Sequence, residues 1–174
     1  MVRWLAILLM LSSGLVMPVP AFSQTTREDP APFGTPVMVG DWSIRVSRVQ
    51  FSADPIVLAT NQFNDPPPDG YQFVMALIDA SYLGPETGDL MWDASFKVVG
   101  LSNRAFDQGD PGCGVVPRDM ASLPEAYPGG RVTANACWAV PQSDVRSLVM
   151  FTDTYVGQSQ GRQFFALSEP GSPR

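Results

Sequence analysis

The sequence predicts an all-β fold, an antiparallel β-sandwich of about seven strands. Short segments in which apolar and polar residues alternate are separated by clusters of proline, glycine, aspartate and serine, as in strands joined by turns. No segment of about 11 or more residues carries an apolar stripe at the helical spacing of 3.6 residues. The chain therefore lacks the signal for a long helix.

The first residues have the composition of an export signal. Arg3 precedes an apolar run that begins at Trp4, and the small residues Ala21 and Ser23 follow it. We expect cleavage after Ser23, so that residues 1–23 are a signal peptide and the mature protein is secreted; an uncleaved anchor helix is the alternative. No later apolar stretch approaches about 18 residues, so the mature form is not expected to span a membrane.

The next two segments differ in pattern. Residues 24–35 are polar and contain prolines, which predicts a flexible spacer. In the segment 36–51, apolar residues alternate with polar ones from position 42 to position 46, which indicates a half-buried strand. The apolar set then shifts by one position at Val49. Because such a shift would turn the side chains to the wrong face, we expect a β-bulge near Ser47–Arg48.

Residues 71–78, YQFVMALI, are apolar on both faces, which indicates a central strand. The preceding NDPPPDG at 64–70 combines three prolines with Asp-Gly turn chemistry and predicts a stiff loop that leads into this strand. The loop tip also stays a candidate for binding. Residues 91–100 are expected to form a third strand.

The second half of the chain contains three more predicted strands, at 131–140, 145–152 and 162–167. The proline-rich segment 113–128 before them reads as irregular. A polar tail at 169–174 ends the chain.

Cys113 and Cys137 are the only cysteines. An even count in an exported chain favours a disulfide. A reactive or metal-binding thiol is the weaker alternative, because no histidine and no cysteine at ligand spacing accompany either residue. Val132 and Trp138 share one face of the strand 131–140, and Cys137 points to the other. The disulfide is therefore expected on the side of the sheet away from the main core, where it would hold the long connection 101–129.

Several pieces of the chain match the order of pieces in a known group of domains. They are residues 42–51, GYQFVMALIDASYLG at 70–84, FKVVG at 96–100, YPGGRVTANACWAVP at 127–141 and VRSLVMF at 145–151. Over roughly residues 36–153 they resemble the immunoprotective extracellular protein type, small bacterial exported domains of unknown function.

The resemblance implies an immunoglobulin-like β-sandwich, outside the cell and without a general catalytic site. With the predicted last strand, which lies beyond the resemblance, we expect this domain to cover residues 36–168. The spacing of Cys113 and Cys137 fits a subset of that group. The antibody-type pattern is absent, because there the two cysteines lie on well-separated strands with a tryptophan between them.

The absence of histidine excludes Ser-His-Asp and Cys-His catalysis and imidazole zinc sites. A serine–lysine pair would have to use Lys97, which alternates with Phe96 and Val98 and is expected to face solvent. The net charge of −6, with no basic stripe, argues against a nucleic-acid partner. We expect no catalytic residue.

Acidic residues are frequent in the predicted loops: Asp65, Asp69, Glu86, Asp89, Asp107, Asp110 and Asp144. Two of them could run glycoside hydrolysis, and loop carboxylates suit Ca²⁺, but nothing in the sequence makes them converge. The segment DQGDPG at 107–112 resembles a calcium loop only weakly, because the D-x-D-x-D-G spacing is absent. We interpret these residues as solvated loop charge and expect no cofactor or metal.

The sequence therefore favours a secreted, non-enzymatic immunoglobulin-like module that binds another protein or an envelope component, either on a sheet face or on the loops at one end. A carboxylate-based hydrolase and a calcium-dependent envelope protein are the alternatives. Trp42 and Trp138 lie on alternating apolar faces and are expected in the core. Trp92 and Tyr82, near strand ends, are candidates for an exposed binding surface.

Overall fold

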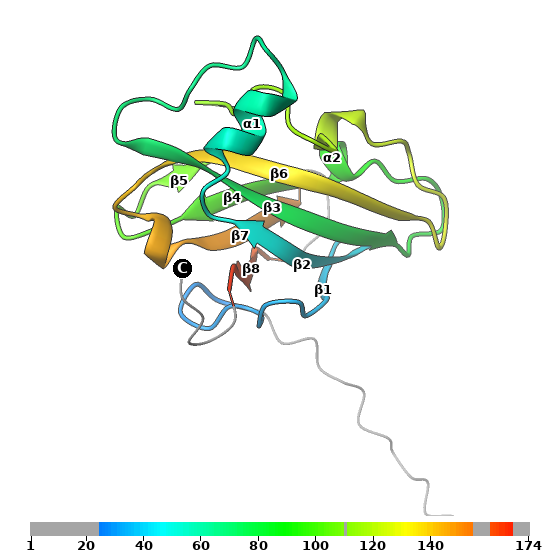
Figure 1. Ribbon diagram of the computed structural model, residues 1–174. Helices are drawn as coiled ribbons and strands as arrows, with labels where there is room; N and C mark the ends of the chain where they lie inside the picture. The colour runs from blue at the N-terminus through cyan, green and yellow to red at the C-terminus, as the bar shows by residue number, and fades with distance from the viewer. Residues whose placement is uncertain (1–24, 110, 155–160, 169–174) are drawn as a thin grey trace, which may run out of the picture.

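A computed structural model of the chain describes residues 25–109, 111–154 and 161–168, and its strands form two four-stranded antiparallel sheets (Figure 1). The first sheet has the order β1 (Val37–Val39), β2 (Trp42–Gln50), β3 (Tyr71–Tyr82), β6 (Arg131–Pro141). The second has the order β5 (Ala105–Phe106), β4 (Ala94–Val99), β7 (Val149–Thr154), β8 (Gln163–Ala166). The predicted antiparallel β-sandwich is confirmed.

The main core lies between the two sheets. Trp42 and Trp138 are 1% and 0% exposed, as predicted, and they pack there with Phe96, Phe106 and Phe165. Burial of each such side chain stabilises the fold by about 1.5–3 kcal/mol. The Trp138 indole also donates a hydrogen bond to the Phe96 carbonyl at 3.0 Å, which links β6 of the first sheet to β4 of the second.

The predicted β-bulge lies in β2. The register passes from Val46↔Ile78 directly to Arg48↔Leu77, so that Ser47 is the extra residue. Because the extra residue reverses the alternation, Val49 returns to the side of the main core and packs against it.

The strand β3 is central, as predicted. It pairs with β2 on one side and with β6 on the other over most of its length. The proline loop before it ends in a tight turn, in which the Tyr71 amide donates to the Pro68 carbonyl at 2.9 Å. Gly70 has φ of 79°, a left-handed conformation that suits glycine.

The predicted strand 91–100 begins later than expected. Leu90–Asp93 forms the short helix α2, because the Asp89 side chain caps it by accepting a hydrogen bond from the Met91 amide. Likewise the predicted strand 145–152 begins with the 3₁₀ turn η2 (Val145–Ser147), and β7 starts only at Val149. The Asp89 cap accounts for the first boundary, and the turn bond from the Ser147 amide to the Asp144 carbonyl at 2.9 Å accounts for the second.

Two further helical segments, α1 (Asp54–Thr60) and η1 (Met120–Ser122), were also not predicted. The helix α1 is too short for a periodicity test, although Pro55 stands in its first turn, where proline is favoured. The 3₁₀ turn η1 lies in the segment read as irregular and is capped by the Asp119 side chain.

The segment 25–35 is not a flexible spacer, which corrects the prediction. Ala31 pairs in parallel with Phe165 of β8 through two backbone hydrogen bonds of 2.9 Å, and Thr25 bonds to Gln163. The segment thus extends the second sheet, with a partner more than a hundred positions away in the sequence. The predicted signal peptide 1–23 and polar tail 169–174 lie outside the described residues.

No helix within the described ranges is long and apolar enough to cross a membrane.

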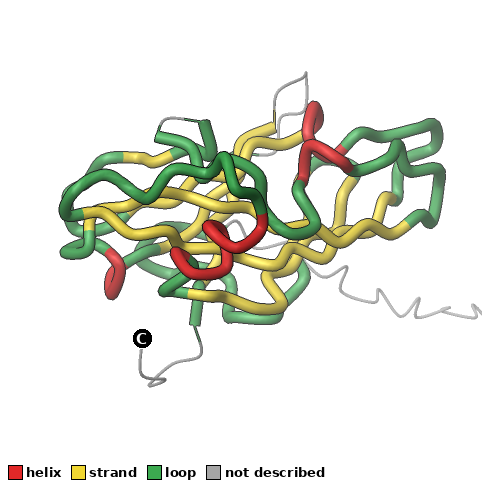
Figure 2. The backbone as a smooth tube through the Cα atoms, turned by 45° about the horizontal axis from the view of Figure 1, so that its top comes forward, coloured by secondary structure: helices red, strands yellow, loops and turns green. Residues whose placement is uncertain are grey.

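A second, smaller core lies on the outer face of the first sheet, where helical and loop segments cover the strands (Figures 1 and 2). It contains Phe73 and Met75 of β3, Val57 of α1, and the disulfide. The Asp54 carboxylate accepts a hydrogen bond from the Phe73 amide at 2.6 Å and so fixes α1 to β3.

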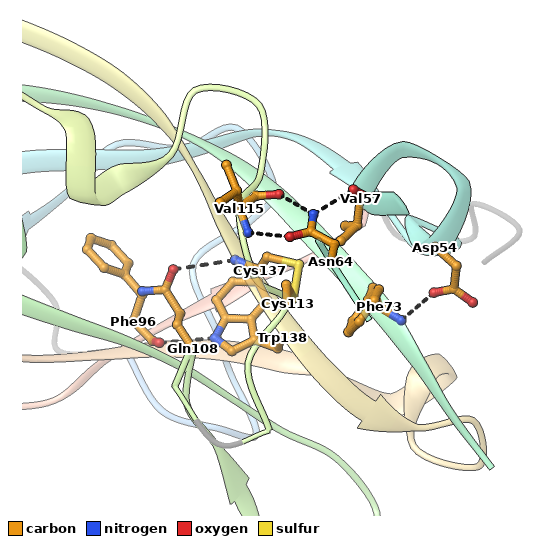
Figure 3. The surroundings of a disulfide bond; sticks show 10 residues. All are labelled: Asp54, Val57, Asn64, Phe73, Phe96, Gln108, Cys113, Val115, Cys137 and Trp138. Carbon is orange, nitrogen blue, oxygen red and sulfur yellow. Dashed lines mark hydrogen bonds between the residues drawn. A yellow bond between two sulfur atoms is a disulfide. The ribbon is translucent and has the colours of Figure 1, made fainter. Parts of the chain in front are cut away.

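The disulfide joins Cys113 to Cys137 on the side away from the main core, as predicted (Figure 3). Asn64 completes the cover. Its side chain donates to the carbonyls of Val57 and Val115, both at 2.7 Å, and accepts from the Val115 amide at 2.9 Å. The tethered loop and α1 are therefore held together as one lid.

Removing the disulfide by Cys113→Ala with Cys137→Ala is expected to lower the free energy of unfolding by about 3 kcal/mol, because the bond spans a separation of 24 residues. Denaturant unfolding measures this loss. Neither cysteine belongs to the main core, so hydrogen exchange should accelerate in α1 and in the loop at 113–116 while β4 and β7 stay protected. Unchanged stability, or equal acceleration in both sheets, would contradict the expectation.

Candidate functional site

The outer face of the first sheet is divided into a covered half and an open half. Along β3 the outward-facing residues are Phe73 and Met75 at one end and Asp79 and Ser81 at the other. The lid of α1 and the disulfide loop covers the apolar end. The polar end is left open.

The open half is hollowed into a groove of about 400 Å³, here called the sheet-face groove. Its lining residues come mainly from three adjacent strands: Pro36, Ser43, Arg45, Asp79, Ala80, Ser81, Arg131, Val132 and Thr133. The strand register aligns its polar side chains in two rows, Arg45–Asp79–Thr133 and Ser43–Ser81–Arg131.

The first row is internally bonded. Arg45 donates from Nε and Nη2 to Oδ2 of Asp79 at 3.2 and 3.0 Å, and the Thr133 hydroxyl donates to Oδ1 at 2.9 Å. Partial burial acts to raise the pKa of Asp79, but hydrogen bonds from Thr133, Arg45 and Ser47 outweigh it and hold the pKa below its ordinary value. Asp79 is therefore an anion over the whole neutral range.

The second row is uncommitted. Among the described residues, the side chains of Ser43, Ser81 and Arg131 have no hydrogen-bond or ion-pair partner. Arg131 is exposed and carries five N–H donors in a planar fork, the geometry that suits carboxylate and phosphate groups. The groove thus offers one unpaired cation beside two free hydroxyls.

This arrangement does not suit acid–base hydrolysis. Asp79 is the one carboxylate among the residues that line the groove, whereas glycoside hydrolysis uses two, one of them with a raised pKa. What the groove can do is bind a ligand by charge-assisted hydrogen bonds.

At the loops next to the groove, Tyr82 corrects a prediction. It is only 4% exposed and packs against Trp42, with ring centroids 4.9 Å apart. Glycines make room for it: a Cβ on Gly84 would lie 2.3 Å from the Tyr82 hydroxyl, and one on Gly88 would lie 2.4 Å from its ring. Trp92, the other candidate, is exposed as predicted, at 71%.

The acidic loop residues do not converge into a metal site within the described ranges. Asp65, Asp69, Glu86 and Asp107 are exposed, Asp89 is the half-buried cap of α2, and Asp110 lies outside the described residues. Lys97 is half-buried on β4 between two residues of the main core, which places it on the outer face of the second sheet.

Asp144 is buried, at 2% exposed, and so corrects the prediction of solvated charge. Its carboxylate accepts hydrogen bonds from the backbone amide and the hydroxyl of Ser102. It also packs on Gly100, where an added Cβ would lie 2.7 Å from the Asp144 Cβ. This carboxylate is structural.

No family model matches the chain, and no curated protein matches it by sequence. An uncharacterized beta-sandwich protein from Clostridium difficile 630 is similar in structure, with a TM-score of 0.50 and 6% identity over 86% of this chain and 97% of that chain. The two proteins share a β-sandwich fold.

Two further solved structures give lower scores. A conserved hypothetical protein from Bacillus anthracis has a TM-score of 0.46 and 12% identity over 78% of this chain and 95% of that chain. The yjhA protein from Bacillus subtilis has a TM-score of 0.42 and 10% identity over 70% and 80%.

The groove residues were missed as a set by sequence reasoning. Each is an ordinary polar member of an alternating strand, and such residues usually only face water. A signal was nevertheless available, because Asp79–Ser81 and Arg131–Thr133 place four polar side chains on the outer face of two strands that pair directly.

Replacing Asp79 by asparagine is expected to lower the free energy of unfolding by roughly 0.5 kcal/mol at neutral pH, because the ion pair with Arg45 is exposed and screened. Since folding depresses the pKa of Asp79, this contribution is present above the unfolded value of about 3.9 and is lost as the pH falls through the lower folded value. Denaturant unfolding from pH 7 to pH 2 tests this. Asp65→Asn, an exposed loop carboxyl, is the control. A difference that persists at pH 2 would argue against the ion-pair origin.

Gly88→Ala is expected to destabilise the protein by about 1–3 kcal/mol, because the new Cβ would overlap the Tyr82 ring at 2.4 Å. Gly109→Ala is the matched control, since its nearest neighbour would lie 3.7 Å away. Thermal or denaturant unfolding compares the two variants. Equal stability of both would mean that Tyr82 does not occupy this position.

Proposed function

We propose that the protein is a secreted, non-enzymatic, immunoglobulin-like module that binds a macromolecular component of the cell envelope through the sheet-face groove. The observation that carries the proposal is the uncommitted row Ser43–Ser81–Arg131 on a sheet face that the lid leaves open. The composition of residues 1–23 and the disulfide support a place outside the cell.

The ligand is anionic. The chain carries a net charge of −6, yet the groove is lined by two arginines and one aspartate, so its local charge has the opposite sign. Arg45 is already paired with Asp79, which leaves Arg131 to receive a carboxylate or phosphate group. The volume of about 400 Å³ falls within the range of ligand sites, and its polar lining suits a hydroxylated, charged chain.

Arg131→Gln is expected to weaken binding to isolated envelope material by about 10-fold or more, because it removes the unpaired cation of the groove. Arg146→Gln is the control. It makes the same change in η2, directly before β7 and outside the groove lining, and should bind like the original protein. Sedimentation of labelled protein with the envelope fraction measures both affinities.

A photo-crosslinking residue at position 81 localises the contact. It should capture the same envelope component that the original protein binds, and capture should fall in the presence of Arg131→Gln. The same residue at position 62, an exposed site in the loop before β3, should not capture it. Equal capture from both positions, or equal affinity of the two arginine variants, would overturn the groove as the site.

A further inference from the structure

A second surface of this molecule carries the opposite charge and lies on the loops at one end of the sandwich. Three loops meet there. The Leu83 amide donates to the Asp41 carbonyl at 2.8 Å, Gly88 and Ala126 exchange backbone hydrogen bonds of 2.9 and 2.8 Å, and the Gly129 amide donates to the Tyr82 carbonyl at 2.9 Å. These bonds make the loops one continuous surface, here called the loop-end surface.

Large apolar side chains are exposed on it. Trp92 is 71% exposed, Tyr127 68%, Leu83 59% and Met91 44%. They are four of the nine large hydrophobic residues exposed among the described residues. Aromatic and methionine side chains of this kind are enriched at protein interfaces, where they supply contact area at a small cost in entropy.

The same loops are strictly acidic. Residues 40–41, 83–93 and 126–130 contain Asp41, Glu86, Asp89 and Asp93 and no lysine or arginine. A Cβ added to Gly84 would lie 2.3 Å from the Tyr82 hydroxyl and 3.0 Å from the Asp41 Cβ, so Asp41 is close to that hydroxyl. Burial, together with the charges of Asp41, Asp93 and Glu86, raises the pKa of Tyr82.

The Tyr82 hydroxyl lies beside these loops, next to Gly84 and Asp41. Tyr82 is 4% exposed, and its hydroxyl has no hydrogen-bond partner among the described residues. The missing side chains of Gly84 and Gly88 leave its ring and hydroxyl in direct contact with the loop backbone. Thr152 Oγ1 is the one buried side-chain atom without a partner in the described part of the chain, so the Tyr82 oxygen is reached by water and can exchange that water for a ligand group.

We propose that the loop-end surface binds a basic, partly apolar segment of a partner protein. A lysine or arginine of the segment is held by Glu86 and by the Tyr82 hydroxyl, and the negative charge of the same loops attracts it. Its apolar residues and the aliphatic part of its side chain pack on Trp92 and Tyr127, where a cation also gains from the aromatic face. The site is separate in charge and in lining residues from the sheet-face groove.

The test uses a fluorescently labelled peptide, Lys-Leu-Lys-Lys-Leu-Lys, and its counterpart with glutamate in place of lysine. Fluorescence anisotropy measures the affinity of the full exported protein for each. We expect the lysine peptide to bind and the glutamate peptide not to bind. Trp92→Ala, Glu86→Gln and Tyr82→Phe should each weaken binding by about 3- to 10-fold.

The control variants are Phe63→Ala and Asp65→Asn. They remove an aromatic residue that is 82% exposed and an exposed carboxylate from the loop between α1 and β3, away from the three loops of the surface. They should bind like the original protein, and Arg131→Gln should not weaken binding. Thermal unfolding confirms that Tyr82→Phe, which keeps the packing on Trp42, is folded.

Two results would overturn the proposal. Equal weakening by the control pair and by Trp92→Ala with Glu86→Gln would mean that the peptide responds only to the overall charge of −6. Absence of binding by the lysine peptide at low salt would mean that the surface has no affinity for a basic apolar segment.

Discussion

The coverage of β3 on both faces is the constraint on which the rest of the structure depends. Its inward residues, from Val74 to Tyr82, fill the main core, and its outward Phe73 and Met75 also have to leave water. The lid, formed by α1 and the disulfide loop, buries these two side chains with few residues. It covers Phe73 and Met75 but not Asp79 and Ser81, so the sheet-face groove is the part of this face that remains open to solvent.

The proline loop NDPPPDG belongs to this arrangement. It connects α1, on the outer face, to the start of β3, and its Asn64 bonds to both α1 and the disulfide loop. Rigid φ angles at three consecutive prolines reduce the entropy lost when this connection is ordered. Its acidic residues Asp65 and Asp69 are exposed, but the conformation of the loop is explained by the lid that it completes.

Sequence reasoning succeeded where one periodic pattern decided the outcome, as in β2 with its bulge and in the two-sided β3. It failed where a local contact or a distant partner determines the structure. The Asp89 cap of α2 is such a local contact, and the pairing of Ala31 with Phe165 is such a distant one. The sequence offered two kinds of binding surface, a sheet face and the loops at one end of the sandwich. The polar residues of β3 and β6 could be read from the alternation of each strand, but the row Ser43–Ser81–Arg131 could not, because only the register of three strands brings it together.

The two surfaces have a common origin at the end of β3. Ser81 and Tyr82 are neighbours in the chain and point to opposite faces, so the positive groove and the acidic loops lie at the same end of the sandwich. Charges closer together than the Debye length of about 8 Å at physiological ionic strength are only partly screened. A basic segment bound on the loops within this length of the groove would raise the potential felt by an anion there, and by linkage the anion would favour the basic segment equally. Opposite charge on adjoining surfaces would make the two proposed binding events mutually supportive.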